Sequence, residues 1–156
     1  MWELLIIIVP SAIAYTMPLL MGALGGLYSE RSGVTNLCIE GLMLFGCFAS
    51  AATIVKLQAI PGFSFNLAIV IGIVVAMLAS TLLAALHAIA SINLKADQTI
   101  SGTAINMLSS ALSLFLAQTI TGSGNITVVR AVIRSDVPIL SKIPVIGPLF
   151  FSETYW

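Results

Sequence analysis

The chain has 156 residues, of which 59% are hydrophobic and only 8% charged, and its net charge is zero. Soluble domains carry about 25% charged residues, so this composition predicts an integral membrane protein surrounded by membrane lipid and excludes a soluble domain. The sequence holds no run of Lys or Arg, so nucleic acid is not an expected partner.

A helix needs about 20 mostly apolar residues to cross a bilayer. Four stretches of the sequence meet that length: 4–27, 35–56, 65–92 and 98–121. They predict an all-α fold, a polytopic helical bundle of about four transmembrane helices in a single transmembrane domain over 1–156. The first stretch carries Pro10 and Pro18, which predict a bend, because proline removes a backbone donor from the helix interior.

Small residues at four-residue spacing predict close helix packing in two of these spans. In the first span the pair is Gly22 and Gly26, and in the third the series is Gly72, Ala76, Ser80, Ala84 and Ala88. His87 lies near the end of the third span without an acidic neighbour in sequence, so we expect a hydrogen-bonded packing residue rather than a proton relay.

The composition of the sequence changes after Thr121, where GSGN is followed by prolines and scattered charged residues. Loops of this length without secondary structure are usually functional or disordered, and the apolar residues of this one argue against disorder. We therefore expect a structured loop over 122–154 that lies on the membrane surface. The final aromatic pair, Tyr155 and Trp156, is typical of a bilayer interface and indicates that another helix follows.

The stretch SERSGVTNLCIEG, residues 29–41, is polar although it lies between two apolar runs. Glu40 falls several residues inside the second predicted span, where an ionised group needs a partner or water, and Arg31 is the nearest basic residue. Gly33, Asn36 and Gly41 indicate non-helical backbone, which survives at membrane depth only against protein or a cavity. Two interpretations stay open: a break between helices that lines a wet space, or a polar turn facing cytoplasm or headgroups.

Polar and small residues recur every three or four positions along the fourth span and form one face of a helix. They are Thr99, Gly102, Asn106, Ser109 or Ser110, Ser113 and Ala117. Such a face either joins helices through hydrogen bonds, at about 0.6 kcal/mol each, or forms the wall of a translocation path. The mid-span position of Asn106 favours the path, so we expect this amide to face substrate rather than to hold helices together.

Sequence motifs for catalysis are missing: there is no GxSxG, no HExxH, no GxxxxGK phosphate loop and no pair of acids on one helical face. We therefore expect no enzymatic activity and no cofactor. Cys38 and Cys47 lie in or beside apolar runs and lack metal-ligand spacing, so they are expected to be buried thiols, and no metal site is predicted.

Three ordered blocks resemble a known family: ALGGLYSERSGVTNLCIEGLMLFG, LKADQTISGTAINML and IPVIGPLFF. They are similar to permease subunits of ATP-driven (ABC) importers in the simple-sugar and nucleoside branch, within the branched-chain amino acid and ribose-type permease superfamily. Such permeases are about twice as long, so the resemblance implies that the N-terminal half is present. Cys38 stands where the family usually has a small residue such as Gly.

The resemblance implies a permease subunit in the plasma membrane of a prokaryote that forms part of the translocation path for a nucleoside or simple sugar. It also implies three kinds of partner: a second permease subunit, ATP-binding subunits that hydrolyse ATP, and an extracytoplasmic solute-binding lipoprotein. The blocks matching 32–41 and 98–106 lie around the central path in related permeases. The implied path residues, together with Ser110 from the polar face, are Asn36, Glu40, Gln98, Gly102, Asn106 and Ser110, and the motif residues that support them are Glu30, Arg31, Gly33 and Gly41.

An alternative from another class is a small multi-pass scaffold or assembly protein, or a channel without ATP coupling, whose polar residues serve helix packing. Orientation is a separate question, because Lys and Arg weakly favour the long loop inside the cell. The family resemblance implies the reverse, with 122–154 outside and the connections 28–35 and 93–97 in the cytoplasm.

Overall fold

The computed structural model describes residues 1–128 and the later positions 130, 139, 141, 143, 144, 147 and 150. Over these residues the chain is all-helical and has no strand, which confirms the predicted fold class. Four helical segments of this part are long and apolar enough to span a membrane. They are α1 (Trp2–Arg31), α2 (Ile39–Gln58), α3 (Phe65–Ala88) with its π-helical continuation η1 (Ile89–Asn93), and α4 (Gln98–Thr121).

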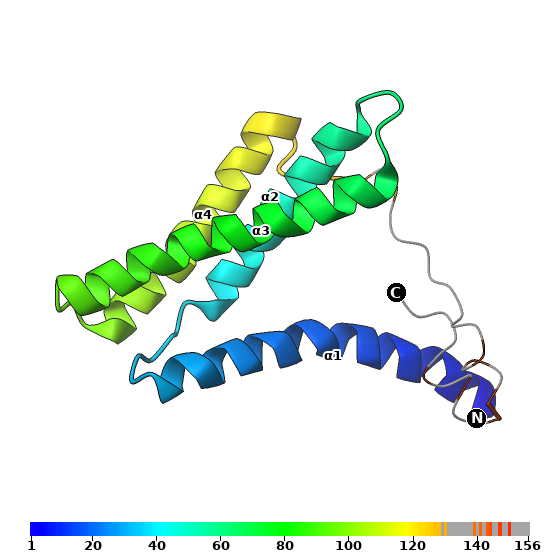
Figure 1. Cartoon of the computed structure of the whole chain (residues 1–156), viewed down its shortest axis with the longest axis horizontal. Coiled ribbons are helices and arrows are strands. Elements are labelled where there is room, and N and C mark those ends of the chain that lie inside the picture. Colours follow the sequence, from blue (N-terminus) through cyan, green and yellow to red (C-terminus); the bar gives the residue numbers. More distant parts are fainter. Residues whose placement is uncertain are drawn as a thin grey trace. The chain divides into compact units, whose positions relative to one another are not determined.

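The chain divides into two compact units, one containing residues 1–24 and the other residues 25–130. In the first unit, α1 continues through Pro10 and Pro18 without interruption. Gly22 lies inside this helix, and its role in packing stays a prediction. The second unit contains α2, α3 and α4, which pack against one another (Figure 1).

The polar stretch after α1 begins with a glycine that ends the helix. Gly33 has φ +84°, a left-handed conformation that glycine adopts without the steric cost of a Cβ. The Gly33 N–H donates to the Glu30 carbonyl over 3.0 Å, and the Val34 N–H donates to the Ser29 carbonyl over 3.3 Å. This pair of bonds is the Schellman motif, which satisfies the last carbonyls of a helix. The sequence SERSGV is therefore a helix stop.

Small residues bring α2 and α3 close together. The Ser80 hydroxyl on α3 donates to the Leu42 carbonyl on α2 over 2.9 Å. A Cβ added to Gly72 would lie 2.7 Å from Cγ1 of Ile54, and one added to Gly46 would lie 3.4 Å from the Ala76 carbonyl oxygen. Ala84 and Ala88 continue this face of α3 and are half-buried.

A histidine side chain near the end of α3 contacts the start of α4. His87 is buried, and its Nδ1 lies 3.0 Å from the Ser101 hydroxyl, whereas its buried Nε2 has no hydrogen-bond partner. Asp97 caps α4, since its carboxylate accepts the Ile100 N–H over 3.0 Å. Helix α4 spans the same residues, 98–121, that the sequence predicts.

The second helix begins at Ile39, four residues later than the predicted start at 35. The residues before it are not helical, because the Asn36 side chain accepts the Cys38 N–H over 3.1 Å and holds a local turn. Glu40 therefore lies in the first turn of α2 rather than several residues inside the span. The expectation of non-helical backbone at Gly41 is also wrong, since Gly41 is helical.

The loop predicted over 122–154, together with its surface position, lies mostly outside the described residues. Its first residues are described: Gly122 ends α4 with φ +73°. The backbone of Arg130 then exchanges two hydrogen bonds with the Gln58 side chain, at 2.9 Å and 3.1 Å. This pair ties the segment after α4 to the end of α2.

Candidate functional site

The linker that joins α1 to α2, residues 32–38, lies along one face of α4. Three residues of α4 at four-residue spacing hold it. The Gln98 side chain accepts the Thr35 N–H over 2.8 Å, and the Asn106 amide nitrogen donates to the Leu37 carbonyl over 2.8 Å. Between them is Gly102, where an added Cβ would lie 3.0 Å from the Leu37 Cβ. Glycine at this position allows the linker to lie close to the helix.

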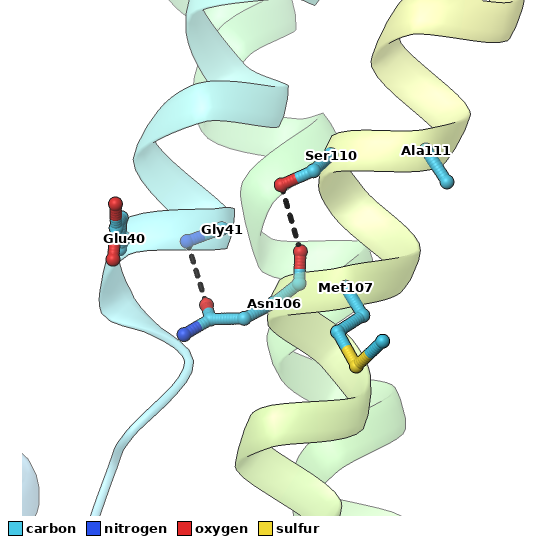
Figure 2. Close-up of a pocket in the computed structure, with 6 residues that line it drawn as sticks. All are labelled: Glu40, Gly41, Asn106, Met107, Ser110 and Ala111. Carbon is cyan, nitrogen blue, oxygen red and sulfur yellow. Dashed lines mark hydrogen bonds between the residues drawn. The ribbon is translucent and has the colours of Figure 1, made fainter.

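Asn106 also caps the start of α2 from outside that helix. The first N–H groups of a helix lack intrahelical partners, and a Ser, Thr, Asp or Asn at the N-cap usually accepts one of them. Here the N-cap is Cys38, which makes no capping bond. Instead the Gly41 N–H donates to the Asn106 side-chain oxygen over 2.7 Å (Figure 2). An interhelical bond thus replaces the missing local cap.

Gly41 allows this approach, because a Cβ there would lie 2.6 Å from the Asn106 side-chain oxygen and 2.8 Å from the Asn106 Cα. Asn36 acts locally: its side-chain oxygen lies 2.8 Å from the Cys38 sulfur in addition to accepting the Cys38 N–H. The Cys38 side chain is fully buried, and that burial raises the pKa of its thiol. The expectation of a buried thiol is wrong for Cys47, which is exposed. Asn36 is not among the residues that line the pocket described next.

A pocket of about 440 Å³ lies between the first turn of α2 and the middle of α4. Figure 2 shows its lining, which consists of two residues of α2 and four of α4: Glu40, Gly41, Asn106, Met107, Ser110 and Ala111. Of the six predicted path residues, Glu40, Asn106 and Ser110 meet here. Gln98 and Gly102 lie on the same helix but contact the linker instead of lining the pocket.

Glu40 is the charged group of the pocket. Its side chain is exposed, and within the described part of the chain it makes neither an ion pair nor a hydrogen bond, so Arg31 is not its partner there. Its place in the first turn of α2 is electrostatically favourable, because the N-terminal end of a helix carries a partial positive charge. Glu30 and Arg31 are exposed at the end of α1.

The polar face of α4 divides into two parts. Ser109 and Ser113 are buried, and their hydroxyls have no hydrogen-bond partner. Ser110 is exposed, lines the pocket and donates its hydroxyl to the Asn106 carbonyl over 3.0 Å. The sequence left Ser109 and Ser110 as alternatives. The packing of α2 against α4 decides between them, because it buries Ser109 and leaves Ser110 exposed.

Sequence reasoning missed four residues of this region. Met107 and Ala111 supply the apolar part of the pocket, and Thr35 and Leu37 provide backbone groups to α4. Helical spacing did not identify Met107 and Ala111, because each directly follows a predicted path residue and adjacent residues do not share a face of a helix. The backbone contacts left no pattern in side-chain types. Among the described residues, no three His, Cys, Asp or Glu lie close enough to hold a metal ion.

Comparison with known proteins gives relatives along nearly the whole chain. It is 40% identical over 156 residues to the guanosine ABC transporter permease protein NupQ of Bacillus subtilis, covering 99% of this chain and 48% of the relative. It is 37% identical over 148 residues to the nucleoside ABC transporter permease protein NupC of Lactococcus lactis, covering 95% and 46%. A putative glucose ABC transporter permease protein, TsgC13 of Haloferax volcanii, is 34% identical over 145 residues, covering 87% and 39%.

The chain therefore spans about half the length of the curated relatives it matches. No solved structure gives a significant match. The bacterial permease relatives and the four apolar helices identify a multi-pass protein of the plasma membrane and a transporter component rather than an enzyme. The family model for the branched-chain amino acid transport system permease component matches residues 8–143. The chain thus belongs to the branched-chain amino acid transport system permease family.

Proposed function

We propose that the chain forms part of the translocation path of an ATP-driven importer for a nucleoside, with a simple sugar as the second substrate class. The observation that carries the proposal is the pocket between α2 and α4, where Glu40, Asn106 and Ser110 offer polar atoms beside apolar Met107 and Ala111. Substrate sites typically combine an apolar lining with a few convergent polar groups. The identity of 40% and 37% to guanosine and nucleoside permeases favours the nucleoside.

Import of this kind requires partners, and we assign them by class. ATP-binding subunits hydrolyse ATP, a second permease subunit completes the path, and an extracytoplasmic solute-binding lipoprotein delivers the substrate. The permease contributes binding and a path rather than chemistry. The bond between Thr35 and Gln98 joins the linker 32–38 to the first residue of α4. We assign this end of the bundle to the cytoplasm and the segment from 122 onward to the outside.

Uptake by intact cells tests the proposal. The gene is deleted from its own organism, and the initial uptake of tritiated guanosine, glucose and leucine is compared in the parent, the deletion strain and a strain with the gene restored. We expect the deletion to lower guanosine uptake and the restored gene to recover it, with leucine unaffected. Unchanged uptake of guanosine and glucose in the deletion strain contradicts a transport role and favours a scaffold.

The same cells separate an importer from a channel. When ATP is depleted, an ATP-driven importer stops accumulating guanosine, whereas a channel still lets it equilibrate across the membrane. Guanosine entry that depends on the gene but persists at the same rate in ATP-depleted cells contradicts the importer.

A further inference from the structure

Some polar atoms of the pocket already make hydrogen bonds within the protein, and others remain available to a ligand. The Asn106 side-chain oxygen accepts the Gly41 N–H, and one N–H of the same amide donates to the Leu37 carbonyl. The Ser110 hydroxyl proton is donated to the Asn106 carbonyl (Figure 2). The protein thus already uses Ser110 as a donor, while the lone pairs of its oxygen stay available.

Glu40 adds two oxygens that accept hydrogen bonds and no donor when ionised. Its side chain is exposed and makes no hydrogen bond or ion pair within the part of the chain that the structure describes. The polar atoms that the pocket still offers are therefore mostly acceptors, with one remaining N–H of Asn106. None of the six lining residues is basic, so the lining provides no charge to balance a phosphate or a carboxylate.

We infer that Glu40 determines specificity in this pocket: its carboxylate accepts hydrogen bonds from an uncharged ligand rich in donors and repels anionic ligands. Resting on the proposed function, the inference narrows the substrate class to neutral nucleosides. Ribose hydroxyls and the N–H groups of a base such as guanine are suitable donors for a carboxylate. A nucleotide brings a phosphate close to this carboxylate, and like charges repel.

Direct binding to the complete permease, purified in detergent without its solute-binding protein, tests this inference. Tritiated guanosine is bound at equilibrium, and unlabelled guanosine and guanosine monophosphate are used as competitors. In the wild type we expect the monophosphate to compete at least about tenfold more weakly than guanosine. Glu40→Gln should weaken guanosine binding by about tenfold or more, the loss that one hydrogen bond to a charged group implies, and should bring the two competitors close together.

Two further variants make the outcome specific. Glu40→Asp keeps the charge, so it should still reject the monophosphate even where guanosine binds more weakly. Glu3→Gln removes a carboxylate in the first turn of α1, and it should behave as wild type. If Glu40→Gln changes neither the affinity for guanosine nor the ratio of competition by guanosine and its monophosphate, the inference is overturned while the proposed function stands. A wild-type protein that binds no guanosine overturns the proposed function, and the inference with it.

Discussion

Asn106→Ala tests how far the start of α2 depends on α4. The substitution removes two hydrogen bonds: one of 2.7 Å from the Gly41 N–H of α2, and one of 2.8 Å to the Leu37 carbonyl of the linker. Hydrogen bonds between helices in membrane proteins average about 0.6 kcal/mol, which gives about 1.2 kcal/mol for the two bonds. Gly41 is buried, and a buried N–H without a partner costs about 1–3 kcal/mol. We expect the free energy of unfolding to fall by about 1–3 kcal/mol.

The assay is unfolding of the purified protein in mixed micelles with increasing denaturing detergent, followed by circular dichroism. Ser110→Ala is the matched control, because its hydroxyl bonds only to the carbonyl of Asn106 in the same helix, and we expect a change of less than about 0.5 kcal/mol. Equal free energies of unfolding for the wild type and Asn106→Ala would refute the capping role.

A second substitution separates capping from other effects. Cys38→Ser places a good N-cap residue before α2, with almost the shape of the buried cysteine, and we expect its hydroxyl to turn from Asn36 and accept the Gly41 N–H. Asn106→Ala should then cost less in the Cys38→Ser protein than in the wild type, and a double-mutant cycle measures the difference. If Asn106→Ala lowers the free energy of unfolding equally in both backgrounds, the serine introduced by Cys38→Ser does not replace Asn106 as the cap of α2.

The remaining predictions concern close approach, chain reversal and orientation. Gly41→Ala should lower the thermal midpoint more than Ala52→Gly, because its Cβ would lie 2.8 Å from a backbone atom of α4; equal midpoints for wild type and Gly41→Ala contradict this. Gly33→Ala should lower the free energy of unfolding by about 1 kcal/mol in the same detergent titration, since a non-glycine residue is strained at φ +84°. An unchanged free energy of unfolding contradicts the requirement for glycine in this Schellman motif. A cysteine introduced at Ser123 should react with a membrane-impermeant thiol reagent in intact cells, and reaction only after permeabilisation reverses the proposed topology.

The helices were predictable because length and hydrophobicity suffice for a membrane span. The observed α4, Gln98–Thr121, has the predicted bounds. The start of α2 was not predictable in the same way, because apolar residues continue through Leu37 and Cys38. The turn there is set by the Asn36 side chain and by backbone bonds to α4, and such tertiary contacts leave no periodic signal in the sequence.

The site was predictable in part. The unusual positions of Glu40 and Asn106 in apolar surroundings identified two residues that line one pocket. Sequence reasoning gave Asn106 a single role, facing substrate rather than holding helices together. The structure gives its amide one bond to α2 and one to the linker 32–38, in addition to a place in the pocket. Spacing identifies the face of a helix but not the atom that each side chain bonds.

Protection of an introduced cysteine by substrate tests the central claim most directly. Cys47, the exposed native cysteine, is replaced by alanine, and Ser110→Cys places a thiol in the pocket. The rate of labelling by a small thiol reagent is then measured in the complete permease with and without saturating guanosine. If the pocket between α2 and α4 lines the path of a nucleoside, guanosine slows labelling at 110 but not at a cysteine introduced at exposed Leu78 on α3. Equal labelling rates at 110 with and without guanosine, in a protein that transports guanosine, contradict the account.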